Sequence, residues 1–281
     1  MNMHKKRRHV QVLVFDFDIK IAYVAYNMVQ AHGKENCILF FTDTQWEDDD
    51  NYRFMEEVSE YIGVDITYRI DGRTPEEVFY DYRFLGNSRM AKCSEELKVR
   101  QTLIFLEELR DDYDLEPILY FGIGPHETHR SDRLKEFYAH NPLEPVETRF
   151  PMIEKFVPDE EIKEIIEKGW GIKLPRMYEL GFTHANCGGR CVRGGFEHYA
   201  QLYKIWPHQY QEQEEMEERF RQYFEKNVSI LKAERKPFTL REYRELMERV
   251  GVDNVIQNGI TKYLRVRDDE RESIPCVCTT F

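Results

Sequence analysis

The sequence lacks any apolar run long enough to cross a bilayer, and its N-terminus lacks the apolar segment of a secretory signal. It has only six cysteines in 281 residues, too few for a disulfide scaffold. Basic residues are also in deficit, with 40 Lys and Arg against 52 Asp and Glu and a formal net charge of -12. This charge disfavours nucleic acid as a partner. Together the absences predict a cytoplasmic protein with reduced cysteines and no membrane partner.

The composition is 41% hydrophobic and 14% aromatic, enough to bury one substantial core, or one core with a smaller appended domain. Apolar runs predict four strands, and apolar residues at helical spacing predict helices between them. The expected strands are Val10–Phe15, Cys37–Phe41, Asp65–Ile70 and Pro117–Phe121, and the expected helices are Ile19–Ala31, Tyr52–Ile62 and Glu95–Leu109. Such alternation predicts an α/β fold, a Rossmann-like and mostly parallel sheet.

The pattern changes after Pro151, where helical segments dominate and little strand signal remains. The expected helices are Asp159–Lys168, Pro175–Leu180, Gly195–Trp206 and Gln211–Lys226. We therefore expect an α/β domain over residues 1–150 and a helical, cysteine-containing region over residues 151–281. The acidic run Glu47–Asp50 is expected at a helix N-terminus, where the helix dipole favours carboxylates.

Four segments, in this order, resemble the phosphoadenosine-phosphosulfate (PAPS) reductase-like family of the adenine nucleotide α-hydrolase superfamily. They are Phe40–Gly63, Ala91–Arg100, Tyr120–Leu134 and Leu174–Tyr199, the last containing HANCGGRCVRGG. The resemblance implies a Rossmann-like domain that binds an adenine nucleotide with magnesium and acts on a sulfur- or phosphate-bearing substrate.

The phosphate-binding loop of that family is replaced here. In the family, a glycine-rich SGGxDS loop after the first strand holds the anionic end of the nucleotide with its backbone amides. The corresponding segment, Asp16–Ile21, reads DFDIKI, with no glycine and two carboxylates. Close approach of a phosphate is therefore disfavoured, and ordinary ATP pyrophosphatase chemistry is not expected.

Three interpretations of this loop remain open. The site has decayed, or Asp16 and Asp18 hold a divalent cation, which prefers carboxylate oxygens. Alternatively, VLVFDFD resembles the first motif of haloacid-dehalogenase phosphatases, with an aspartate nucleophile. Ile19 and Lys20 depart from the glycine and threonine usual in that motif.

The resemblance implies further site residues. Adenosine contacts are implied at Asp43 and Thr44, and cleft positions at Gly122, Glu127 and Arg130, which follow a predicted strand. Cys93, Lys98 and Arg100 are implied as a catalytic, substrate-phosphate or sulfur-handling group, in which the cations would lower the pKa of the thiol. Simpler roles remain possible for each group. Asp43 would cap a turn, Glu127 and Arg130 would form an ion pair, and the basic side chains of Lys98 and Arg100 would be solvated on the side of a helix.

Four cysteines are spaced as two close pairs. Cys187 and Cys191 lie in a glycine-rich C-x3-C segment, and Cys276 and Cys278 form a C-x-C pair near the C-terminus. Four converging thiolates would hold an iron–sulfur cluster or tetrahedral zinc. The alternative is four ordinary reduced cysteines. His184 is expected to support the ligands, and Cys37 to pack in the core.

Two functions follow from these observations. One is a nucleotide-linked enzyme of the PAPS reductase-like class, working in a cleft at Asp43, Cys93, Lys98 and Arg130. The other is a catalytically silent pseudoenzyme that keeps the fold and binds or regulates a protein partner through a tyrosine-rich surface.

Overall fold

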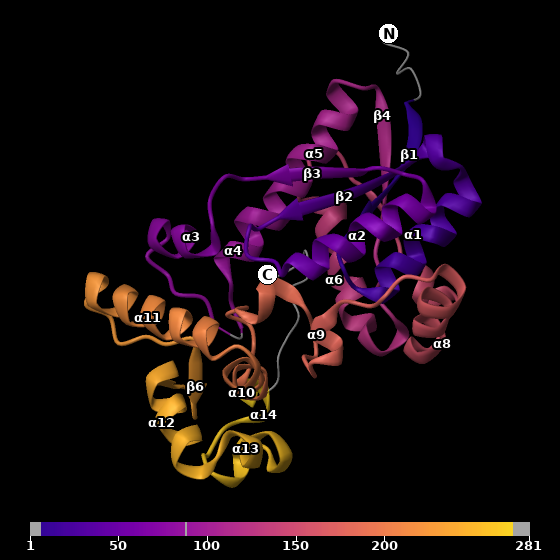
Figure 1. The fold of residues 1–281 in the computed structure, drawn as a ribbon. Helices are drawn as coiled ribbons and strands as arrows, with labels where there is room; N and C mark the ends of the chain where they lie inside the picture. The colour runs from indigo at the N-terminus through magenta and orange to yellow at the C-terminus, as the bar shows by residue number, and fades with distance from the viewer. Residues whose placement is uncertain (1–6, 88, 272–281) are drawn as a thin grey trace. The chain divides into compact units, whose positions relative to one another are not determined.

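The computed structural model describes residues 7–87 and 89–271, which form two compact units. The first comprises Met1–Asp43, Asp49–Asp71 and Lys98–Pro175. The second comprises Thr44–Asp48, Gly72–Leu97 and Arg176–Phe281. Figure 1 labels the elements along the chain.

The first unit is built on a five-stranded sheet in which every pairing is parallel. The strands are β1 (Arg8–Val14), β2 (Cys37–Asp43), β3 (Ile66–Ile70), β4 (Leu115–Tyr120) and β5 (Glu147–Arg149), in the order β3-β2-β1-β4-β5. The predicted Rossmann-like α/β class is confirmed. Of the five strands in this sheet, β5 alone was not predicted, because its three residues lack an apolar run.

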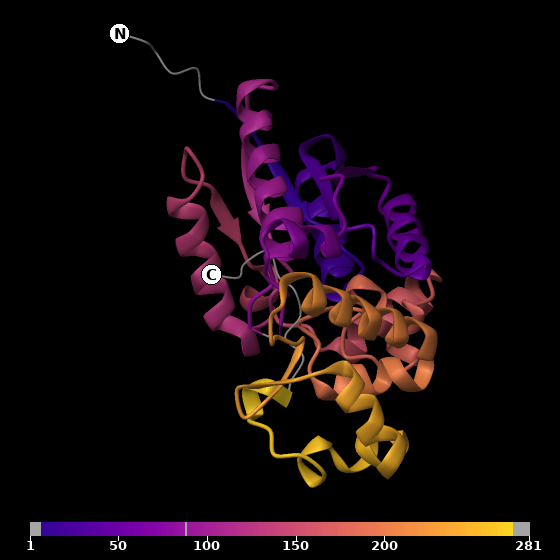
Figure 2. The same cartoon turned by 90° about the vertical axis from the view of Figure 1, so that its left-hand side faces the viewer.

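Helices cover both faces of this sheet, as right-handed crossovers require. They are α1 (Ile19–His32), α2 (Asp49–Ile62), α5 (Arg100–Asp111), α6 (Thr128–His140), α7 (Pro151–Glu154) and α8 (Asp159–Glu164), the last followed by a π-helical turn, Ile165–Trp170. Figure 2 shows the sheet between α5 on one side and α1 with α2 on the other. The core lies between these layers, where the Phe40 and Phe105 rings stack 4.1 Å apart.

The second unit is mainly helical. Its elements are α3 (Pro75–Asp81), α4 (Lys92–Ser94), α9 (Arg176–Glu179), α10 (Phe196–Ile205), α11 (Pro207–Phe224), β6 (Leu231–Ala233), β7 (Lys236–Phe238), α12 (Leu240–Val250), α13 (Val252–Asn258) and α14 (Asp268–Arg271). Its 3-10 turns are Asn186–Gly189 and Ile260–Lys262. Buried tyrosines tie it together: the Tyr210 hydroxyl donates to the Leu240 carbonyl (2.7 Å), and the Tyr243 hydroxyl to the Phe196 carbonyl (2.8 Å).

None of the helices in the described residues is both long and apolar enough to span a membrane.

Candidate functional site

The strand order places a topological switch point in the first unit, between β1 and β4. The chain runs from β1 to β2 and β3 on one side, while β4 and β5 lie on the other. In open α/β sheets, ligands bind beyond the carboxyl ends of strands at such a point. The segments that follow β1 and β4, residues 15–18 and 121–124, meet at this edge of the sheet.

Gly122 permits the close approach of these two segments. A Cβ atom at this position would lie 2.6 Å from Cγ1 of Ile21 and 3.2 Å from its backbone nitrogen. Any larger residue would therefore push β4 away from the first turn of α1. The structure thus gives Gly122, a predicted cofactor-binding residue, a packing role beside the switch point.

Asp16 and Asp18 form the loop that enters α1. Asp16 Oδ1 accepts a hydrogen bond from the Asp18 backbone N–H (2.7 Å), and Asp18 Oδ1 accepts one from the Lys20 N–H (2.8 Å). Asp18 is therefore the N-cap of α1, where a phosphate would otherwise meet the helix amides. Burial raises the pKa of the Asp18 carboxyl, although the charge and N–H group of Lys20 oppose this.

A pocket of about 260 Å³ lies at this switch point, wholly within the first unit. It is lined by Lys20, Gly124, Pro125, His126, Glu127, Met152, Phe156, Pro158 and Asp159. The His126 ring meets the Phe156 ring edge-on, with 5.8 Å between centroids. Proline, methionine and phenylalanine give the pocket apolar walls, and charged groups stand among them.

Two ion pairs set the charge of this pocket. Lys20 Nζ lies 3.2 Å from Asp159 Oδ2. Glu127 forms an ion pair with Arg130, which was the simpler of the two roles expected for these residues. Both pairs remain partly exposed to solvent. An anionic ligand would therefore have to draw Lys20 away from Asp159, at modest cost because exposed pairs are weak.

The predicted adenosine-binding residues fall in different units. Asp43 is the last residue of β2, rather than beyond it, and its Oδ1 accepts a hydrogen bond from the Tyr52 hydroxyl (2.7 Å). Thr44 belongs to the second unit, where its hydroxyl donates to Oε1 of Glu47 (3.2 Å).

The predicted catalytic group lies on three consecutive helical segments. Cys93 is in α4, Lys98 is in the π-helical turn Glu95–Val99, and Arg100 opens α5. The predicted single helix over Glu95–Leu109 is thus interrupted, a feature often found at functional sites. Cys93 and Lys98 are buried and Arg100 is exposed, so the expectation that these bases are solvated holds only for Arg100.

The cysteine loop, residues 182–195, has a left-handed turn at its centre. Cys187, Gly188 and Gly189 have φ values of 55°, 55° and 83°. Cys187 and Cys191 are buried and carry no disulfide within the described residues. Gly188 is needed because a Cβ there would lie 3.0 Å from the Trp46 carbonyl oxygen. Cys276 and Cys278 lie outside the described residues.

Glu47 supports this loop, which corrects the prediction that it belongs to a helix N-terminus. The α2 helix begins only at Asp49, and Glu47 is a buried residue of the second unit. Its Oε2 atom accepts a hydrogen bond from the Cys187 N–H (2.6 Å). Beside it, the Arg190 guanidinium lies over the Trp46 ring, 4.9 Å from the centroid.

Two stacked imidazoles lie behind the loop. The rings of His184 and His198 are 4.5 Å apart, and His198 Nε2 lies 2.9 Å from the Gly189 carbonyl oxygen. Burial lowers the pKa of His198 to about 4, so the ring is neutral at pH 7. No group of three or more His, Cys, Asp or Glu side chains in the described part of the chain is arranged to hold a metal.

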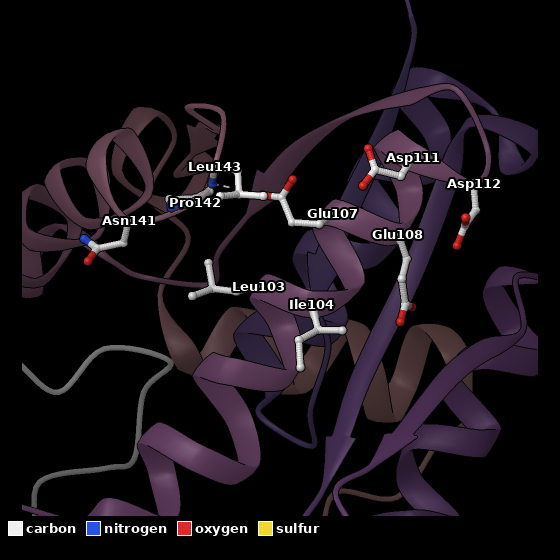
Figure 3. A pocket seen from close by; sticks show the side chains of 9 residues that line it. All are labelled: Leu103, Ile104, Glu107, Glu108, Asp111, Asp112, Asn141, Pro142 and Leu143. Carbon is white, nitrogen blue, oxygen red and sulfur yellow. Dashed lines mark hydrogen bonds between the residues drawn. The ribbon is translucent and has the colours of Figure 1, made fainter.

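A larger pocket, of about 370 Å³, lies elsewhere in the first unit and includes none of the predicted site residues. Figure 3 shows its lining side chains: Leu103, Ile104, Glu107, Glu108, Asp111, Asp112, Asn141, Pro142 and Leu143. Glu107 Oε1 accepts a hydrogen bond from the Leu143 N–H (3.2 Å). With four carboxylates and no basic residue in its lining, this pocket disfavours an anionic nucleotide.

No protein-family model matches the chain, and the search of curated proteins likewise gives no significant match.

Proposed function

We propose that this is a PAPS reductase-like protein that binds an adenine-nucleotide-type ligand and acts on a sulfur- or phosphate-bearing substrate. The observation that carries the proposal is the pocket at the switch point, with Lys20 on the first turn of α1. The parallel sheet and its strand order support it, because this is where such folds bind nucleotides.

The ligand would be held differently from a nucleotide in an ordinary phosphate loop. Asp18 already caps α1, so the helix amides are not the anion site. The cations Lys20 and Arg130, each in an ion pair, would take that role once the ligand replaces their carboxylate partners. Magnesium bound with the nucleotide would offset repulsion from Asp16 and Asp18.

The second candidate is a pseudoenzyme that serves as a protein-binding or regulatory module. The specific observation in its favour is the same cap: Asp18 Oδ1 accepts the hydrogen bond of the Lys20 N–H, a group that a bound phosphate would otherwise use. Exposed tyrosines such as Tyr113 and Tyr223 would suit a protein partner.

Calorimetric titration with ATP and PAPS, with and without magnesium, distinguishes the two. We expect binding to the wild-type protein that weakens roughly tenfold in Lys20→Met, through loss of a charge-assisted contact. Lys168→Met is the matched control, since Lys168 is exposed on the same unit. A folded protein that binds neither nucleotide under any condition would refute the proposal and favour the pseudoenzyme.

The variant Asp16→Ala/Asp18→Ala tests the loop itself. If the carboxylates only cap α1, nucleotide binding persists or strengthens in this variant, because negative charge is removed from the anion site. If they hold a divalent cation, magnesium-dependent binding disappears instead.

We further propose that Cys187, Cys191, Cys276 and Cys278 hold an iron–sulfur cluster or zinc. Cys187, within the left-handed turn, and Cys191, after it, are both buried, which suits them as one half of a four-thiolate site. The metal would fix the C-terminal pair to the loop. Elemental analysis and a visible spectrum of anaerobically purified protein test this, with Cys187→Ser as the variant. Protein without stoichiometric metal would contradict it.

A further inference from the structure

Arg193 is a buried cation, and no ion pair joins it to a carboxylate of the described residues. It lies in the turn that closes with a hydrogen bond from the Gly194 N–H to the Cys191 carbonyl (2.8 Å), and only 5% of its surface is exposed. Its Nε and Nη1 atoms are buried and have no hydrogen-bond partner among residues 7–87 and 89–271. Burial of an unpaired guanidinium is energetically costly, so this arrangement favours a negatively charged partner.

Arg110 shows how the same chain treats a buried arginine whose partners are internal. Its side chain is fully buried, and Nη2 lies 2.6 Å from Oε1 of Glu116. Its guanidinium also donates to the carbonyl oxygens of Glu144 and Pro145, both at 2.8 Å. Arg193 has no comparable set of contacts within the described residues.

The turn that carries Arg193 leads directly into α10. This ten-residue helix has Gly195 as its N-cap, and no side chain makes a capping hydrogen bond there. By contrast, Thr239 and Glu242 cap α12 reciprocally. The N–H groups of the first turn of α10 therefore give partial positive charge to the helix end that directly follows Arg193 in the chain.

This turn packs on a neutral imidazole ring. A Cβ at Gly194 would lie 2.6 Å from Cδ2 of His198, so the turn packs directly on that neutral ring. The first turn of α10 also carries one carboxylate, that of Glu197. The close packing of Gly194 on His198 thus restricts the backbone next to Arg193.

We propose that Arg193 and the N-terminal turn of α10 bind an oxyanion, a phosphate or sulfate group. A guanidinium and a helix N-terminus are the two protein groups best matched to such oxygens. Every residue of this site belongs to the second unit, whereas Lys20 and the switch-point pocket belong to the first. The inference therefore stands independently of the proposed nucleotide site.

The test is thermal unfolding and calorimetry in an oxyanion-free chloride buffer, with added inorganic phosphate or sulfate. Binding to the folded state should raise the melting temperature of the wild-type protein beyond the effect of potassium chloride at equal ionic strength. In Arg193→Met, affinity should fall roughly tenfold to a hundredfold, because a charge-assisted contact is lost. Arg193→Lys should fall between the two, since it keeps the charge without the planar fork.

The stability of the same variants distinguishes a loss of anion binding from a folding defect. Without an oxyanion, Arg193→Met should be at least as stable as the wild-type protein, because an unpaired buried charge is replaced by an apolar side chain. Arg249→Met is the matched control: it removes an exposed arginine from the same unit and should leave anion binding unchanged. Lys20→Met should also keep the oxyanion response, which separates this site from the nucleotide proposal.

Three outcomes would overturn the inference. The wild-type protein shows no stabilisation by phosphate or sulfate beyond that of chloride. Arg193→Met binds the oxyanion as tightly as the wild type. Or Arg193→Met is strongly destabilised in oxyanion-free buffer, which would show that Arg193 already has an internal partner, such as a metal-bound thiolate.

Discussion

Glu217 on α11 makes the stability of the second unit depend on pH in an unusual direction. Only 1% of its surface is exposed, and its two oxygens accept hydrogen bonds from the backbone N–H groups of Ile230 and Leu240, both at 2.7 Å. Burial raises the pKa of this carboxyl to about 7, and the two N–H groups offset only part of that rise.

The sign follows from proton linkage. Below pH 4.5 the carboxyl is protonated in the folded and unfolded chains alike, and between 4.5 and about 7 only the folded chain keeps the proton. Stability therefore falls as the pH rises through this window and levels off above it. The gap between about 7 and the ordinary value of 4.5, at about 1.4 kcal/mol per pKa unit, gives roughly 3 kcal/mol.

Urea unfolding of the wild-type protein and Glu217→Gln, measured from pH 4.5 to pH 8, tests this value. The free energy of unfolding of the wild type, minus that of the variant, should fall by roughly 3 kcal/mol across the range, since contributions from other groups cancel. Glutamine offers one acceptor oxygen fewer and adds a pH-independent offset. Glu215→Gln, exposed on the same helix, is the control. A difference that stays flat, or that rises with pH, would refute the reasoning.

Two other sites give stability predictions. Glu234 and Arg235 both have positive φ (51° and 67°) in the β6–β7 turn, so Arg235→Gly should raise the free energy of unfolding by about 1 kcal/mol, whereas Lys236→Gly, in the adjoining strand, should lower it. Asp111 is the last residue of α5 and places negative charge at the negative end of the helix dipole, so Asp111→Lys should stabilise by up to about 1 kcal/mol. Asp132→Lys, on the second turn of α6, should have the opposite sign, because it removes the ion pair with Lys135 and puts positive charge toward the N-terminal end of the helix. Denaturant titration measures the free energy of unfolding of each variant. If a variant and its control change this free energy equally, the argument for that site is wrong.

The sequence predicts the central sheet well where local signals are strong. The runs that became β1, β2 and β4 are continuous and apolar, and the helices between them have clear periodicity. The β6–β7 hairpin escaped prediction because its turn residues, Glu234 and Arg235, are not those that favour positive φ. By contrast, the start of α3 could have been predicted, because Thr74 and Glu77 form a capping box and Pro75 lies on the first turn.

The candidate site is less predictable, because its decisive features arise from tertiary contacts. The replaced loop at Asp16 and Asp18 is visible in the sequence, but the capping of α1 by Asp18 becomes evident only from the backbone geometry. Glu47 resembles any acidic residue before a helix, yet one of its oxygens accepts a hydrogen bond from Cys187, 140 residues later. Arg193 carries no local sign of burial, since arginine near glycines is ordinarily exposed.

The support that Glu47 gives to the cysteine loop has a consequence for the order in which the chain folds. During synthesis, residues 44–48 emerge long before the cysteine loop, whose Cys187 N–H donates a hydrogen bond to Glu47. Until then the carboxylate must stay hydrated, so the second unit can complete its fold only near the end of translation. A fragment ending at residue 150 would leave Glu47 and Trp46 without the loop, exposing an aromatic ring and making the truncated chain prone to aggregation.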